Sequence, residues 1–300
     1  MTQRREMRAI VTGATAGLGR ATAGTLAAVG MSVTLAVRDV EKGARTAAEI
    51  TAEQSSADIT VTRIDLADLN SVRSAARSIR DAGPVDLLVN NAGLSVSGTR
   101  RTTAQGYELH MGVNHLGHFV LTAELMPALL AAEHPRVVSL SSIAHRMTGR
   151  LDPRLGSGAD YSAWKAYAQS KLACGLFGLE LDRRARTAGI DLTSLVGHPG
   201  WSATQLFTHT GTDRQRGLHR LFKSTEVALA SSPAQGVQSQ LRAALDPSLR
   251  GGELIGPRWV LWGPPRVEKP AGNMRDLNSA RILWELSEER TGTRLDLAAR

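Results

Sequence analysis

Short apolar runs alternate with longer Ala-rich segments of helical periodicity over the first two thirds of the chain. The apolar runs, nearly continuous in Val, Ile and Leu, occupy residues 9–11, 32–37, 59–64, 85–89, 136–140 and 190–195. Such runs are typical of strands that are covered on both faces. The helical segments between them include 21–29 and 40–52. This alternation predicts an α/β fold of the Rossmann type, with a doubly wound parallel sheet and right-handed crossovers.

The pattern becomes less regular after residue 200. Residues 202–225 are polar and irregular, and we predict a substrate lid there because long irregular segments in compact domains are usually functional. A helix is expected over 233–245, a short strand over 252–255 and a last helix over 280–290, with a Pro/Trp-rich passage at 256–270. No linker or repeat interrupts the chain, so we expect a single domain over 1–300 that includes a C-terminal extension over 257–300.

Composition narrows the functional classes. The net charge of +8 comes from scattered arginines without a dense basic tract, so we expect attraction of a phosphorylated cofactor and no nucleic-acid binding. The one cysteine, Cys174, excludes an internal disulfide and is expected to be a packed thiol. No signal-peptide pattern or apolar run of ~20 residues is present, which predicts a cytoplasmic protein without a membrane anchor.

A glycine-rich turn joins the first predicted strand to the first predicted helix. Glycines in such a turn let the backbone approach a pyrophosphate, and the helix start offers N–H groups and the positive end of its dipole. The residues assigned to this phosphate loop are Gly13, Thr15, Gly17, Leu18 and Gly19. A simple turn is the alternative, but the position between strand and helix favours binding of a dinucleotide.

The residues after the second strand predict which nicotinamide dinucleotide is used. A carboxylate at the strand tip would bind the adenosine ribose and repel a 2′-phosphate. Here the tip is apolar and Arg38 follows, whose guanidinium can pair with phosphate through two hydrogen bonds. We therefore predict NADP(H), with NAD(H) less favoured. The alternative is that Arg38 is a solvated cation and Asp39 serves the ribose.

These features, with further motifs in the expected order over residues 8–205, resemble the short-chain dehydrogenase/reductase family. The matching positions are Asp65, Leu66, Asn91, Ala92, Gly93, Asn114, Ser142, Tyr167, Lys171, Pro199 and Gly200. Residues 38–43 and 113–119 look most like its retinol-dehydrogenase-like branch. The resemblance implies that Asn114 holds a water, that Lys171 grips the nicotinamide ribose, and that Thr204 holds the carboxamide. It also implies a homodimer or homotetramer, often formed through the helices that contain Asn114 and Tyr167, although the C-terminal extension could cover one of these surfaces and leave a monomer.

The chemistry of Tyr167 and Lys171 can be argued from the residues themselves. Reduction of a ketone needs a proton for the oxygen as hydride reaches the carbon. Lys171 lies four residues after Tyr167 on one helical face, and its ammonium favours the phenolate, as does an oxidised nicotinamide. Ser142, at the end of a strand, can hydrogen-bond the reacting oxygen. These residues predict a general acid/base centre, in which Ser142 and Tyr167 contact the substrate.

A second pair with the same spacing, Tyr161 and Lys165, competes for this role. A helix from Lys171 to residue 187 descends ~24 Å and the next strand climbs back ~23 Å, which returns Gly200 to the level of Lys171. Starting from Lys165 overshoots by about 9 Å. We therefore assign catalysis to Tyr167 and expect Tyr161 to pack near the pocket mouth.

The remaining histidines and tryptophans are not assigned a catalytic role. His115 and His118 lack a carboxylate or thiol at ligand spacing, so no metal site is expected and packing is favoured. His198 is expected to orient the turn before Pro199. Trp201 is assigned to the substrate pocket, whereas Trp259 and Trp262 could line the pocket or cover the C-terminal tail.

Three functions remain open from the sequence. The favoured one is interconversion of a carbonyl and an alcohol on a hydrophobic small molecule. The alternatives are reduction of a carbon–carbon double bond and a non-catalytic NADP(H)-binding redox sensor. The intact Ser142, Tyr167 and Lys171 argue against the sensor, because binding alone needs no proton donor.

Overall fold

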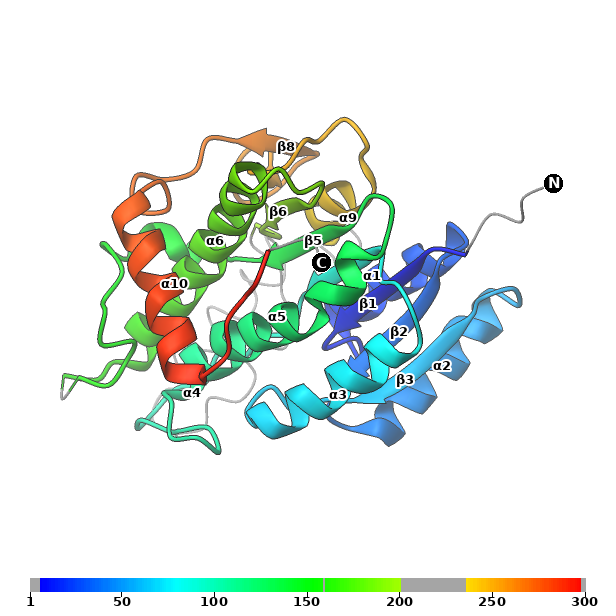
Figure 1. Cartoon of the computed structure of the whole chain (residues 1–300), viewed down its shortest axis with the longest axis horizontal. Helices are drawn as coiled ribbons and strands as arrows, with labels where there is room; N and C mark the ends of the chain where they lie inside the picture. Colours follow the sequence, from blue (N-terminus) through cyan, green and yellow to red (C-terminus); the bar gives the residue numbers. More distant parts are fainter. Residues whose placement is uncertain (1–5, 159, 201–235, 298–300) are drawn as a thin grey trace, which may run out of the picture.

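An eight-stranded sheet runs through the centre of the molecule in the order β3-β2-β1-β4-β5-β6-β7-β8 (Figure 1). The structure is a computed structural model, and it describes residues 6–158, 160–200 and 236–297. The strands are β1 (Arg8–Thr12), β2 (Ser32–Val37), β3 (Ile59–Arg63), β4 (Leu87–Asn90), β5 (Arg136–Leu140), β6 (Thr193–Gly197), β7 (Leu254–Pro257) and β8 (Pro265–Glu268). Neighbouring strands are parallel except for the antiparallel pair β7–β8.

Helices cover both faces of this sheet, and alternation along each strand decides which face a side chain meets. Ile10 packs with the group of helices that includes α3 and α5, whereas its neighbours Ala9 and Val11 pack with α1 and α2. The helical elements are α1 (Gly17–Ala28), α2 (Val40–Glu53), α3 (Leu69–Asp81), α4 (Leu109–Met111), the π-helical turn η1 (Gly112–Leu116), α5 (Gly117–Leu130), the 3₁₀ turn η2 (Ile143–Met147), α6 (Ala163–Thr187), α9 (Gln238–Leu245) and α10 (Leu277–Thr291). The predicted doubly wound Rossmann-type fold is confirmed.

Most predicted strands lie where the apolar runs placed them, but one is shifted and one was missed. The strand expected over 190–195 is Thr193–Gly197, because Gly189 adopts a left-handed φ of 69° and Ile190 N bonds back to Ala185 O, which keeps the chain in a turn. The Pro/Trp-rich passage contains β8, which pairs with β7 at the edge of the sheet. This strand was missed because prolines argue against a central strand, whereas an edge strand tolerates them. The predicted lid at 202–225 lies outside the described residues.

The C-terminal helix α10 runs along α6 and is part of the hydrophobic core (Figure 1). Its Trp284 is 3% exposed, stacks on Phe177 and meets the edge of Phe119, and the guanidinium of Arg184 lies 4.3 Å from its ring. The C-terminal extension therefore covers part of α6, a helix through which a partner subunit was expected. Across the described part of the chain, no helix is both long and apolar enough to span a bilayer.

Candidate active site

A cavity of about 1090 Å³ opens at the carboxyl ends of the central strands. The strand order reverses between β1 and β4, and such a switch point is where open α/β sheets bind ligands. Seventeen of the residues singled out in the sequence line this cavity: Gly13, Thr15, Gly17, Leu18, Gly19, Arg38, Asp39, Asp65, Leu66, Asn91, Ala92, Gly93, Ser142, Tyr167, Lys171, Pro199 and Gly200. Trp201 and Thr204 lie outside the described residues. The fold thus brings the phosphate loop and the proposed catalytic group to one cavity.

The glycine loop is packed so tightly that side chains would close it. A Cβ on Gly19 would meet the carbonyl oxygen of Gly13 and would lie 2.6 Å from Asn91 Nδ2. Gly13 and Gly17 have left-handed φ values of 67° and 54°, which glycine adopts without strain. The N-cap of α1, Ala16, provides no side-chain acceptor for the first amides of the helix. This bare helix start suits an anionic group such as a pyrophosphate.

Thr12 joins the glycine loop to the turn after β4, a role that the sequence analysis did not assign. Its hydroxyl accepts hydrogen bonds from the backbone N–H groups of Asn91 and Ala92, each at 2.9 Å, and lies 2.9 Å from His118 Nε2. His118 Nδ1 lies 3.0 Å from the Asn114 carbonyl oxygen, which can only accept, so Nδ1 donates and Nε2 accepts from Thr12. Burial lowers the pKa of His118 to about 4 and keeps it neutral. His118 is a packing residue, as expected.

Two cations lie at the tip of β2. Arg38, Asp39 and Lys42 all line the cavity, and Asp39 also caps α2 by accepting a hydrogen bond from Lys42 N at 3.0 Å. Asp39, the alternative ribose partner, is therefore engaged with the start of its own helix. Lys42 was missed, although it lies in the first turn of α2, four residues after Arg38.

Ser142, Tyr167 and Lys171 also line this cavity. Ser142 follows β5 and caps η2, and Tyr167 and Lys171 lie one turn apart near the start of α6. Lys171 Nζ donates to the Leu140 carbonyl oxygen at 3.1 Å. A Cβ on Gly93 would lie 3.0 Å from that same Nζ and would crowd the ammonium. The structure therefore places these three side chains in the wall of one cavity.

Asn114 lies behind this group rather than in the cavity wall. It belongs to η1, and π-helical turns are frequent at functional sites. Its Oδ1 accepts from Leu94 N at 2.8 Å, and its Nδ2 donates to Leu94 O and to Ser170 Oγ. Its carbonyl oxygen accepts from the buried thiol of Cys174 at 3.1 Å. Asn114 therefore fixes the cavity wall at Leu94, and its water-holding role remains a prediction.

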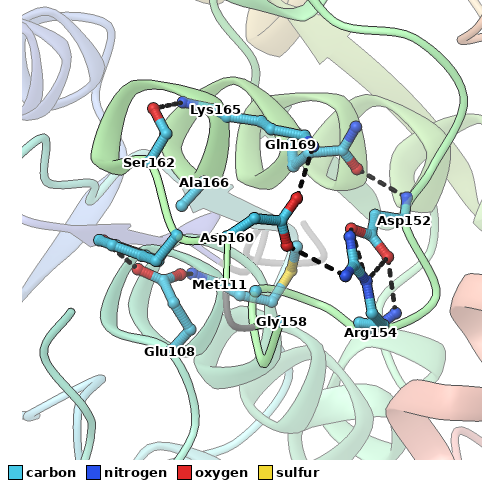
Figure 2. A pocket seen from close by; sticks show the side chains of 12 residues that line it. Glu108, Met111, Asp152, Arg154, Gly158, Asp160, Ser162, Lys165, Ala166 and Gln169 are labelled. Atoms are coloured by element: carbon cyan, nitrogen blue, oxygen red, sulfur yellow. Dashed lines mark hydrogen bonds and ion pairs between the residues drawn. The ribbon is translucent and has the colours of Figure 1, made fainter.

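The competing pair, Tyr161 and Lys165, faces a different and much smaller cavity of about 30 Å³ (Figure 2). The Tyr161 hydroxyl donates to Glu108 Oε1 at 3.1 Å, and Lys165 lies 3.9 Å from Asp160. Burial, followed by the charge of Glu108, raises the pKa of the Tyr161 phenol, which disfavours the phenolate. Neither residue lines the large cavity. The structure thus separates the two pairs, and Tyr167 lines the same cavity as the phosphate loop.

Other aromatic and sulfur side chains were assigned less well. Trp164, three residues before Tyr167 on the same helix face, lines the cavity and was missed, as was Met147. Trp259 and Trp262 are 56% and 49% exposed and contribute to neither the cavity lining nor the buried core. His198 does orient its turn, because its Nδ1 accepts from Gly200 N at 3.2 Å.

Comparisons with known proteins agree with this geometry. A family model described as short chain dehydrogenase matches residues 7–215. Mouse polyprenol dehydrogenase is 39% identical over 95% of this chain and 83% of that protein, and human retinol dehydrogenase 11 is 36% identical over 96% and 86%. The crystal structure of an uncharacterized protein from Mycobacterium Paratuberculosis superposes with a TM-score of 0.77 at 36% identity, covering 97% of this chain and 95% of that one. The chain belongs to the short-chain dehydrogenase/reductase family, and its curated relatives place it in the retinol-dehydrogenase-like branch.

Proposed function

We propose that this oxidoreductase uses NADP(H) to interconvert a carbonyl and an alcohol on a hydrophobic small molecule. The observation that carries the proposal is the single cavity that holds Ser142, Tyr167 and Lys171 together with the glycine loop. A bound nicotinamide supplies or accepts the hydride. In reduction, the Tyr167 hydroxyl gives its proton to the substrate oxygen, and in oxidation its phenolate takes that proton back. Ser142 holds the oxygen by a hydrogen bond, and the Lys171 ammonium favours the phenolate.

The part of the cavity wall near Tyr167 supports an apolar substrate. Val96, Ile143, Met147 and Trp164 line it, and the Trp164 ring lies 5.8 Å from the Tyr167 ring. Polyprenol and retinol, which appear in the names of the relatives, are both apolar isoprenoid alcohols. Burial of such a chain against these side chains would contribute roughly 25 cal/mol per Å² of apolar surface. We therefore place the substrate in the class of long-chain or polyisoprenoid alcohols and their aldehydes or ketones.

The preference for NADP(H) is supported by the cations at the tip of β2. Arg38 and Lys42 line the cavity where a 2′-phosphate would extend, and Asp39 is occupied as a helix cap. Replacement of Arg38 by Gln is expected to raise the Michaelis constant for NADPH by roughly ten- to 100-fold, since a charge-assisted hydrogen bond contributes about 1.5–3 kcal/mol. The constant for NADH should change little. Equal Michaelis constants of the wild-type enzyme for NADPH and NADH would refute the preference.

The catalytic assignment is tested by following NADPH absorbance against a panel of ketones, aldehydes and enones. Tyr167→Phe should lose nearly all turnover and still bind NADPH. Tyr107→Phe is a matched control, because the Tyr107 hydroxyl donates to the carbonyl oxygen of Arg290 and Tyr107 does not line the cavity. Turnover only with enones would favour reduction of a carbon–carbon double bond. Tight NADPH binding without oxidation by any substrate would favour the redox sensor, and turnover that depends on Tyr161 but not on Tyr167 would refute the assignment.

A further inference from the structure

Glu108 and His110 form a buried acid–imidazole pair beside the cavity wall. Their side chains are 1% and 0% exposed, and Glu108 Oε1 lies 2.8 Å from His110 Nδ1. The other carboxylate oxygen accepts from Met111 N at 2.8 Å, and Oε1 also accepts from the Tyr161 hydroxyl. Figure 2 shows Glu108 beside Met111. Burial alone would raise the pKa of Glu108, but the hydrogen bonds from His110 and Met111 outweigh it and hold this pKa below its ordinary value.

The hydrogen bonds of His110 determine its tautomer. Val96 N lies 3.0 Å from His110 Nε2, and a backbone N–H can only donate. The Nε2 atom must therefore carry a lone pair, so the proton of the neutral ring is on Nδ1 and points to Glu108. A carboxylate can only accept, which fits this arrangement. Glu108 thus stabilises the one tautomer that can hold Val96.

The same ring contacts the proposed acid/base residue. The His110 and Tyr167 ring centroids are 6.1 Å apart in an edge-to-face arrangement, and Trp164 flanks Tyr167 at 5.8 Å. The held residue, Val96, lines the cavity, and Asn114 holds the same segment at Leu94. His110 therefore contacts both Tyr167, the proposed acid/base residue, and Val96, which lines the cavity.

We propose that Glu108 and His110 are positioning residues, which fix the Tyr167 ring and the cavity wall at Val96 through the Nδ1–H tautomer of His110. This inference rests on the proposed role of Tyr167. Neither residue needs to exchange a proton with the substrate. The tautomer matters because the alternative Nε2–H form would direct a donor at the Val96 N–H, and the wall would move away from the ring.

Nuclear magnetic resonance of ¹⁵N-histidine-labelled protein tests the tautomer without any assay of activity. Two-bond ¹H–¹⁵N spectra distinguish a protonated Nδ1 from a protonated Nε2, and the signals of His110 are identified by their loss in His110→Gln. Wild-type His110 is expected to be neutral and protonated on Nδ1. Glu108→Gln should move it toward the Nε2–H form and shift the Val96 amide resonance, because the amide group can donate where the carboxylate could only accept.

Kinetics then test the consequence for catalysis. Glu108→Gln should lower kcat by about tenfold, since misplacement of a reacting group by about 1 Å can cost up to 10²-fold, while the dissociation constant of NADPH stays within twofold. Glu180→Gln is the matched control: Glu180 is also buried and ion-paired, with Arg183 and Arg184, but lies thirteen residues after Tyr167, about 20 Å along α6. It should change neither the tautomer nor kcat.

Two results would overturn the inference. One is a wild-type His110 protonated on Nε2, a measurement that stands even if Glu108→Gln fails to fold. The other is a Glu108→Gln enzyme that has the altered tautomer but keeps kcat within twofold of wild type. Failure of the proposed function would look different, because Tyr167→Phe would then keep its turnover whatever the state of His110.

Discussion

The buried histidines predict a steep loss of stability in mild acid. His115, His118 and His145 are at most 3% exposed, and burial lowers their pKa values to about 3, 4 and 4. In the unfolded chain each imidazole takes a proton near its ordinary pKa of 6.5. Between pH 6.5 and 4 the unfolded state therefore binds more protons than the folded state, so the free energy of unfolding decreases as the pH falls.

The size of the effect follows from these pKa values. Lowering the pH from 7 to 5 decreases the free energy of unfolding by about 2 kcal/mol for each histidine that is protonated only in the unfolded state. Three such groups give about 5–6 kcal/mol, which is a large part of the ~5–15 kcal/mol that stabilises an ordinary domain. Carboxylates contribute little in this interval, because ordinary values of about 4 mean that they titrate mainly below pH 5.

Urea unfolding of the protein without cofactor at pH 7 and pH 5, followed by circular dichroism, measures this difference. His118→Gln should reduce the pH-dependent loss by about 2 kcal/mol. His134→Gln, a control at a side chain that is 78% exposed, should leave nearly all of it. Equal free energies of unfolding at pH 7 and pH 5 in the wild-type protein would show that these imidazoles are not held neutral, and the argument would fail.

Three substitutions test other parts of the structure. Gly19→Ala should weaken NADPH binding by at least tenfold in a fluorescence titration. Gly24→Ala, where a Cβ meets no atom within 4 Å, should bind NADPH normally, and its free energy of unfolding should rise by up to about 1 kcal/mol. Equal binding by the two would contradict the close packing of the loop. Thr12→Val should lower the free energy of unfolding in urea by about 2–3 kcal/mol, because it leaves the Asn91 and Ala92 N–H groups without their acceptor. Thr12→Ser, which keeps the hydroxyl, should avoid most of that loss. Trp284→Ala should lower the free energy of unfolding by about 3–5 kcal/mol. A decrease of less than about 1 kcal/mol would mean that α10 is not part of the core.

Much of the candidate site could be predicted because its signals are local. A buried parallel strand needs a continuous apolar run, and a phosphate loop needs glycines at the turn that follows it, so the sequence located β1 and Gly13–Gly19 without further information. The choice between Tyr167 and Tyr161 also followed from the lengths of one helix and one strand. Boundaries set by turns were less certain, as β6 shows, and β8 was missed because its prolines are tolerated only at a sheet edge.

Only the tertiary structure decided which distant side chains meet. The hydrogen bond between Thr12 and His118 joins residues 106 positions apart, and that between His115 and Ser287 joins residues 172 positions apart. No periodicity encodes such pairs, because they depend on how helices pack across the sheet. The same is true of His110, which looks like any polar residue in the sequence until folding places its ring between Glu108 and Tyr167. The sequence by itself determined most of the strands and the chemical groups at their ends, and packing determined the orientation, tautomers and charge states of those groups.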